Sequence, residues 1–174
     1  MIPTAAEMIR QGNVGVVPTD TLYGLLASAH NKKAVERVYG LKGRSPEKKF
    51  IILISSIEEL SSFSITLTEE QREVIGRFWP GPVSIVLQGG IAFRLPDDAK
   101  LISFLKESGP CIAPSANPEG LQPAETIEEA RKYFGDKVDF YMDGGKLSGM
   151  PSTLIALDEK GVVTILREGK KFVV

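Results

Sequence analysis

The sequence predicts one α/β domain, residues 1–174, with a twisted sheet of mixed parallel and antiparallel strands and flanking helices. Three observations lead to this prediction. Segments with helical periodicity alternate with short aliphatic runs along the chain. Residues 14–17 and 50–54 are uninterrupted apolar runs, which are typical of strands covered on both faces. Two tight connections, residues 88–90 and 158–161, predict hairpins and therefore some antiparallel pairing.

Helix starts are marked by side chains that can cap free backbone N–H groups. Asn31 is the expected cap of a helix whose apolar residues recur at helical spacing up to Leu41. A further apolar helix is expected over residues 99–105. Gly12, Gly135 and the prolines within residues 79–82 are the expected helix ends. Three threonines form capping boxes with a Glu or Gln three residues later: Thr4 with Glu7, Thr68 with Gln71, and Thr126 with Glu129.

The predicted strands are short and mostly apolar. In chain order they are residues 14–17, 50–54, 83–87, 91–95, 111–113, 138–142, 152–157 and 162–166. No internal repeat and no low-complexity linker interrupts them, so we expect a single domain.

Composition excludes several classes of protein. Hydrophobic residues make up 43% and charged residues 25% of the chain, which excludes disorder. The net charge of −1 provides no overall attraction for nucleic acid or anionic lipid. One cysteine, Cys111, and one histidine, His30, cannot form an internal disulfide or a structural zinc site. Residues 1–4 lack the pattern of a signal peptide, and the run 50–54 is too short to cross a membrane, so we expect a cytoplasmic protein.

Four polar segments rich in Gly, Pro, Ser or Thr lie at the ends of predicted strands, where open α/β sheets bind ligands. They are residues 18–24, 42–49, 113–118, and 151–153 together with 166–169. The residues alone also leave a purely structural explanation open for each segment. In the same order, these are a capped turn leading into a helix, a solvated basic turn, an Asn-Pro turn, and a surface ion pair between Arg167 and Glu168.

The segment 42–49 is the strongest candidate for an anion site. It carries Lys42, Arg44, Lys48 and Lys49 in a chain with no overall positive charge. Arginine offers a planar fork of donors to phosphate oxygens, and lysine offers a mobile point charge. Held close together, these cations repel one another unless water or an anion relieves the repulsion.

Hydroxyl and amide groups in the other segments suit a small polar ligand. Thr19, Asp20 and Thr21 can orient a zwitterion or a phosphate, while Ser115 and Asn117 can each donate and accept hydrogen bonds. Phosphate-binding loops of the Walker or GxGxxG type are absent, as is a convincing catalytic triad. Cys111 is expected in the core and His30 as a capping or surface residue.

Taken together, seven motifs in order resemble the YrdC/Sua5/YciO family, over residues 14–169. Each motif alone is weak, whereas seven in the same order are specific. The absence of sequence beyond Val174 resembles the single-domain form of that family. The motifs are Pro18-Thr19-Asp20-Thr21-Leu22-Tyr23-Gly24-Leu25, Lys42-Gly43-Arg44, Phe78-Trp79-Pro80-Gly81-Pro82, Arg94-Leu95-Pro96, Pro114-Ser115-Ala116-Asn117, Pro151-Ser152-Thr153 and Leu166-Arg167-Glu168-Gly169.

The resemblance implies a large basic cavity and L-threonylcarbamoyladenylate synthase activity, a nucleotidyl transfer. L-threonine, bicarbonate and ATP, with Mg²⁺, would give threonylcarbamoyl-AMP and pyrophosphate, and partner proteins would transfer the product to adenosine 37 of tRNA (t6A). It implies catalytic roles for Lys42 and Arg44 and no protein-bound metal. The implied ATP-binding residues are Arg44, Lys48, Asn117 and Arg167, and the implied threonine-binding residues are Thr21, Arg94, Ser115 and Ser152.

The sequence departs from the family pattern at several positions. Phe50 and Ile51 replace a usual Pro-Leu, Ser84 replaces a usual Thr, and Pro118 and Glu119 follow Asn117 in place of Ser-Gly. Three alternatives to the implied function therefore stay open. They are a divergent YciO-like paralogue, a module that binds tRNA or double-stranded RNA without making the adenylate, and a related enzyme with a different amine or carbamoyl donor.

Overall fold

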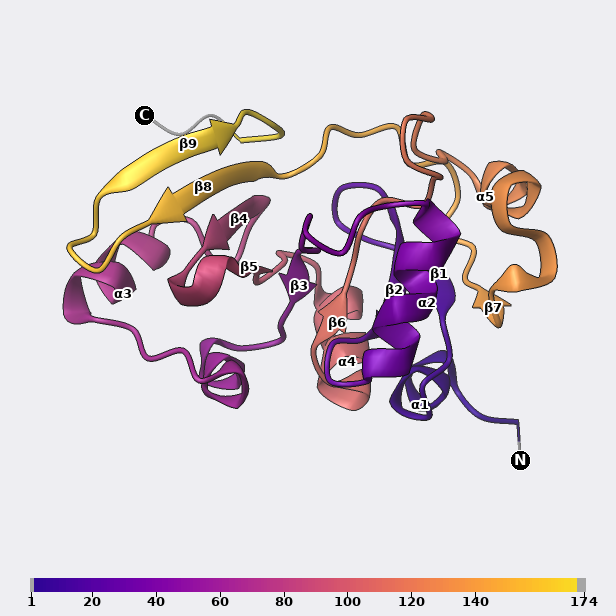
Figure 1. The fold of residues 1–174 in the computed structure, drawn as a ribbon, viewed down its shortest axis with the longest axis horizontal. Helices are drawn as coiled ribbons and strands as arrows, with labels where there is room; N and C mark the ends of the chain where they lie inside the picture. Colours follow the sequence, from indigo (N-terminus) through magenta and orange to yellow (C-terminus); the bar gives the residue numbers. More distant parts are fainter. Residues whose placement is uncertain (1, 172–174) are drawn as a thin grey trace.

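The computed structural model describes residues 2–171, which form helices around one nine-stranded mixed sheet (Figure 1). The strand order is β7-β1-β2-β6-β3-β5-β4-β8-β9. Parallel pairs are β1 with β7, β3 with β5, and β4 with β8, and the other neighbours are antiparallel. The predicted α/β class with a mixed sheet is confirmed. The strands are β1 Gly15–Pro18, β2 Tyr23–Ser28, β3 Ile52–Leu53, β4 Val83–Val86, β5 Ala92–Arg94, β6 Cys111–Ile112, β7 Phe140–Tyr141, β8 Thr153–Leu157 and β9 Val163–Arg167.

The helices begin where the capping residues predict. Thr4 and Thr68 form complete capping boxes, and Asn31 accepts a hydrogen bond from the backbone N–H of Ala34. The third box is only half formed, because Glu129 accepts from the backbone N–H of Glu125 instead. The α-helices are α1 Ala5–Arg10, α2 Lys32–Lys42, α3 Glu69–Ile75, α4 Ala99–Ser108 and α5 Ile127–Phe134, and 3-10 helices span Ile57–Phe63, Gln88–Gly90 and Gly135–Lys137.

Strand β2 is the main element that the sequence does not predict. One interpretation of residues 18–24 is a capped turn that leads into a helix. The residues of β2, Tyr-Gly-Leu-Leu-Ala-Ser, have no strong strand preference of their own. In the structure, β2 pairs with β1 through a short turn and with β6 on its other side. Neighbouring strands, rather than local propensity, therefore make this segment a strand, and the helical interpretation is wrong.

The sheet separates two apolar clusters. Val17, Leu26 and Cys111 pack on the face that α1 and α4 cover, while Val16 and Leu25 face the larger cluster on the opposite side. Burial raises the pKa of Cys111 to about 12, which fits the predicted core role. Within residues 2–171, no helix is both long and apolar enough to span a bilayer.

Candidate functional site

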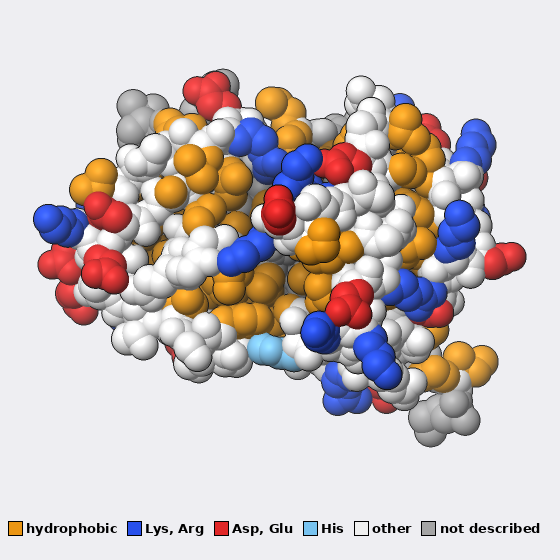
Figure 2. Space-filling model, in the orientation of Figure 1, with side chains coloured by type: hydrophobic (Ala, Val, Ile, Leu, Met, Phe, Trp, Pro, Cys, Tyr) orange, Lys and Arg blue, Asp and Glu red, His pale blue; other side chains and the backbone are white. Residues whose placement is uncertain are grey.

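A cavity of about 630 Å³ lies at the ends of the central strands. Four cationic side chains and two carboxylates line it: Arg44, Lys49, Arg94 and Arg167, with Glu47 and Glu125. In Figure 2, Lys and Arg side chains gather near the middle of the face shown, beside the end of β9. Six of the nine residues predicted to form the site line this cavity: Thr21, Arg44, Arg94, Ser115, Ser152 and Arg167.

Lys42 joins the two loops that the sequence analysis singled out. Its side chain is only 3% exposed, and Nζ donates hydrogen bonds of 2.7 Å to the backbone oxygens of both Ser115 and Asn117. Burial lowers the pKa of Lys42 to about 8, and the neighbouring Arg44 contributes to this decrease. Lys42 does not line the cavity. The structure places it as the cation that holds the Ser115–Asn117 loop against the end of α2.

Arg44 enters the cavity because α2 ends two residues earlier. Gly43 adopts φ 62°, a left-handed conformation that turns the chain at the helix end. The Arg44 guanidinium then lies 5.4 Å from the centre of the Phe50 ring, and its Nε donates to the backbone oxygen of Lys48 at 3.1 Å. These contacts fix the direction of the side chain, which lines the cavity.

Lys49, rather than the predicted Lys48, lines the cavity. Lys48 forms an exposed ion pair with Glu119 at 2.8 Å and does not line the cavity. Lys49 does line it, and its Nζ donates to the backbone oxygen of Gly89. The basic character of this segment was evident from the sequence, but which lysine faces the cavity was not.

Ser115 and Asn117 have different surroundings. Ser115 lines the cavity, and its hydroxyl donates to Oδ1 of Asn117 at 2.6 Å. Asn117 is buried, and its Nδ2 donates to the backbone oxygens of Pro118 and Leu121. Asn117 therefore shapes its own loop and orients Ser115, and it does not line the cavity.

The opposite wall contains Ser152, which precedes β8. Its hydroxyl lies 2.8 Å from that of Ser84 on β4, in a fully buried contact. Arg167, at the end of β9, donates to the backbone oxygen of Ser152 at 2.9 Å. Burial lowers the pKa of Arg167, and the charge of Arg44 lowers it further. Two cations thus face one cavity from distant parts of the chain, an arrangement that favours a bound anion.

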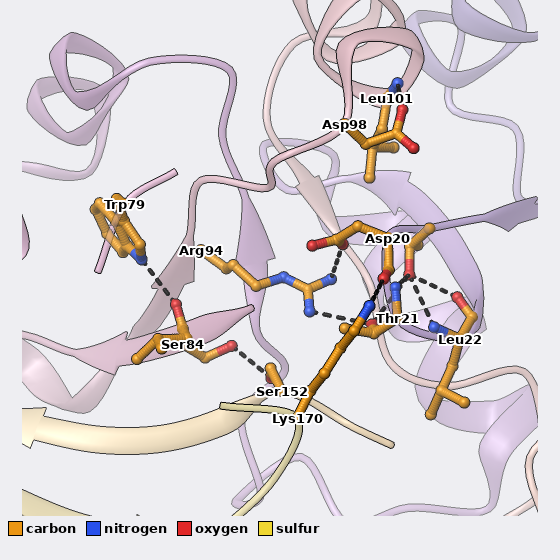
Figure 3. A network of polar contacts seen from close by, with 12 residues as sticks. Asp20, Thr21, Leu22, Trp79, Ser84, Arg94, Asp98, Leu101, Ser152 and Lys170 are labelled. Carbon is orange, nitrogen blue, oxygen red and sulfur yellow. Dashed lines mark hydrogen bonds and ion pairs between the residues drawn. The ribbon is translucent and has the colours of Figure 1, made fainter. Parts of the chain in front are cut away.

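Arg94 provides a third cation at the end of β5, shown in Figure 3. Its Nη1 donates to the hydroxyl of Thr21 at 3.1 Å, and its Nη2 forms an ion pair of 3.0 Å with Asp20. Burial raises the pKa of Asp20 above its ordinary value, against the opposing effect of Arg94. Asp20 lies beside Thr21 in the same motif, so its presence near the site was foreseeable, but its pairing with Arg94 was not.

The described residues do not build a metal site of their own. Across residues 2–171, no three His, Cys, Asp or Glu side chains are grouped so that they could hold an ion. Glu47 and Glu125 line the same cavity without a third carboxylate beside them, and Glu125 is paired with Lys146 at 3.2 Å. The cavity lining thus combines four cations and several hydroxyl groups with these two carboxylates.

The Sua5/YciO/YrdC family model, described as telomere recombination, matches residues 7–169. The chain belongs to this family. It is 35% identical to the threonylcarbamoyl-AMP synthase of Pyrococcus abyssi, an alignment that covers 97% of this chain and 54% of that protein. The crystal structure of Sua5 from P. abyssi complexed with L-threonine matches with a TM-score of 0.85 and 33% identity, over 95% of this chain and 53% of that one.

The chain spans about half the length of these two relatives. The crystal structure of YciO from Escherichia coli matches over 95% of this chain and 87% of that one, with a TM-score of 0.83. Its identity of 24% makes this a likeness of fold. The resemblance inferred from the seven motifs is confirmed as family membership, and the family fold is the one observed.

Proposed function

We propose that this chain is a threonylcarbamoyl-AMP synthase, a nucleotidyltransferase that acts in the cytoplasm on L-threonine, bicarbonate and ATP. One observation carries the proposal: a single cavity brings Arg44, Arg94 and Arg167 together with hydroxyl side chains, which include those of Thr21, Ser115 and Ser152. Cations suit a triphosphate, and a guanidinium beside hydroxyls suits a hydroxyamino acid. The names of the relatives, and the L-threonine bound by the P. abyssi protein, support the same assignment.

The reaction requires two anions to meet. The amine of threonine adds to bicarbonate, forming a carbamate and releasing water. A carbamate oxygen then attacks the α-phosphorus of ATP, forming the acyl phosphate bond while the bond to pyrophosphate breaks. No covalent intermediate with a protein nucleophile is needed, so the barrier is largely electrostatic and positional.

The cavity residues have distinct proposed roles in this reaction. Arg44 and Arg167 bind the phosphates and offset the charge that develops on the α-phosphoryl group. Arg94 binds the carboxylate of threonine, and Thr21, Ser115 and Ser152 supply hydrogen-bonding groups for the amino acid. Lys49 lines the same cavity as Arg44 and is the lysine best placed to assist with the nucleotide.

Three of the predicted site residues do not line the cavity and would support it from behind: Lys42, Lys48 and Asn117. We assign Lys42 and Asn117 to holding and shaping the loop that carries Ser115, because their hydrogen bonds end on that loop. Lys48 orients Arg44 through its backbone oxygen. Mg²⁺ would be held mainly by the phosphates of ATP, where it would supply further charge neutralisation. Proteins of the t6A pathway would take the product and transfer it to tRNA.

Pyrophosphate release tests the proposal. The purified chain is incubated with ATP, Mg²⁺ and bicarbonate, together with L-threonine, L-serine or no amino acid. We expect release that depends on bicarbonate and is fastest with threonine. Equal release in all three mixtures would reject the threonine assignment. No turnover, combined with RNA binding that weakens steeply with salt, would favour the RNA-binding alternative.

A further inference from the structure

Arg94 is buried at the cavity wall with part of its hydrogen-bonding capacity unused. The residue is 4% exposed, and its backbone oxygen accepts a hydrogen bond from Ile54 as β5 ends beside β3. Its Nη1 and Nη2 contact Thr21 and Asp20, whereas Nε has no hydrogen-bond partner within residues 2–171. Arg94 lines the cavity, and a guanidinium held at a cavity wall is suited to receive a carboxylate.

The turn that holds Arg94 is itself rigid. The hydroxyl of Thr19 accepts hydrogen bonds from the backbone N–H groups of Thr21 and Leu22 and donates to the backbone oxygen of Leu22 at 2.6 Å. Lys170, from the segment after β9, donates to the backbone oxygen of Asp20 at 2.8 Å. Figure 3 shows the Asp20 carboxylate directed at Arg94 from this turn. The side chain of Arg94 is thus anchored to a preorganised loop.

Asp20 does not line the cavity, so it acts on a ligand through Arg94. Its Oδ1 lies within ion-pair distance of Nη2 but accepts no hydrogen bond within residues 2–171, so the attraction is mainly between charges. The pair is almost fully buried, with side-chain exposures of 5% for Arg94 and 9% for Asp20. At such burial, a guanidinium without a partner charge would destabilise the folded state, and its side chain could adopt another orientation.

We propose that Asp20 is a positioning residue that holds the Arg94 guanidinium in the direction needed to bind the α-carboxylate of the amino-acid substrate. This inference rests on the proposed function for the identity of that substrate. It assigns Asp20 to the amino-acid half of the cavity alone, because the phosphate-facing cations Arg44 and Arg167 make no contact with it.

Equilibrium binding separates this inference from the proposed catalysis. The dissociation constants of L-threonine and of ATP are measured by calorimetry for the wild-type chain and for Asp20→Asn, which removes the charge at almost constant volume. We expect the threonine constant to rise by about 10-fold or more, the scale of one charged hydrogen bond, and the ATP constant to stay unchanged.

Asp98→Asn is the matched control. Asp98 is a nearby carboxylate that caps α4 by accepting from the backbone N–H of Leu101 at 2.8 Å and makes no ion pair with Arg94. Asparagine caps a helix about as well as aspartate. This variant therefore loses the same charge without loosening Arg94, and threonine affinity should stay at the wild-type value.

Each result decides the inference. If Asp20→Asn does not fold, Asp20→Glu replaces it, since it keeps the charge but moves the carboxylate by one methylene. Unchanged or tighter threonine binding in a folded Asp20 variant would overturn the inference, as would equal weakening in Asp98→Asn or no threonine binding by the wild type. If the wild type binds threonine but forms no adenylate, the proposed function is rejected. The binding constants of the variants still test the role of Asp20 in that case.

Discussion

The ammonium group of Lys42 lies 2.7 Å from the backbone oxygen of Ser115, and this contact joins segments 73 residues apart. Two backbone oxygens of the same loop share this donor, and the Oδ1 of Asn117 lies 3.3 Å away. The contact explains why a lysine of the Lys-Gly-Arg motif does not line the cavity. Lys42 therefore links the end of α2, which Arg44 follows, to the loop that carries Ser115.

Replacing Lys42 should therefore destabilise the fold. Lys42→Met keeps the length of the side chain but leaves the backbone oxygens of Ser115 and Asn117 without their donor. We expect a loss of about 1–3 kcal/mol in the free energy of unfolding, measured by urea denaturation. Lys48→Met is the control, because the exposed pair with Glu119 contributes at most about 1 kcal/mol. Equal losses in both variants would contradict the supporting role.

The pKa of Lys42 also predicts how stability depends on pH. It is lowered to about 8 in the folded chain from the ordinary 10.5, so between these values the unfolded chain binds more protons. The contribution of Lys42 to stability should therefore rise as pH increases from 8 to 10.5. The free energy of unfolding of the wild type minus that of Lys42→Met, measured across this range, should increase. A constant difference would show that this lysine has an ordinary pKa in the folded chain.

Arg44→Ala should slow adenylate formation. Removing one charged donor from a site where phosphate charge develops costs about 2 kcal/mol of barrier or more, equivalent to about a 30-fold loss. Pyrophosphate release at saturating substrates measures the effect. Arg10→Ala removes an exposed arginine outside the cavity and should leave the rate unchanged. A wild-type rate in Arg44→Ala would reject the role assigned to this guanidinium.

Ser84→Ala tests how Ser152 is oriented. The variant leaves the Ser152 hydroxyl without its buried partner, which should cost about 1–3 kcal/mol of stability. The freed hydroxyl should also weaken L-threonine binding, measured by calorimetry. Ser61→Ala removes an exposed hydroxyl that bonds only to its own 3-10 helix, so its effect should stay within about 0.5 kcal/mol. If threonine binds equally well to Ser84→Ala, Ser84 has no part in orienting Ser152.

Two glycine substitutions should have opposite effects on stability. A Cβ at Gly169 would lie too close to the backbone oxygen of Pro151, so Gly169→Ala should force the segment after β9 away from β8 and destabilise the fold by about 1–3 kcal/mol. Gly40 lies within α2, where an added methyl group would meet no atom within 4 Å. Gly40→Ala should therefore stabilise the helix by about 0.5–1 kcal/mol. Thermal unfolding compares the two, and a stabilised Gly169→Ala would contradict the observed packing.

Features set by local chemistry were predictable from the sequence. Thr68 with Gln71 marked the start of α3, because a capping box depends on residues three positions apart. The hairpins at 88–90 and 158–161 followed from their turn residues for the same reason. Strand β2 could not be predicted from its own residues. Its conformation depends on pairing with β1 and with β6, and β6 lies far from it along the chain.

The α/β class, the helix starts, the family and the polar segments of the candidate site could all be predicted from the residues alone. The sequence could not decide which side chain of each segment faces the cavity. Lys49 rather than Lys48 lines it, Lys42 lies outside its lining, and Asp20 pairs with Arg94 behind its wall. These directions are set when the chain folds, because the direction of a side chain depends on where a helix ends and on which distant backbone groups require hydrogen-bond partners.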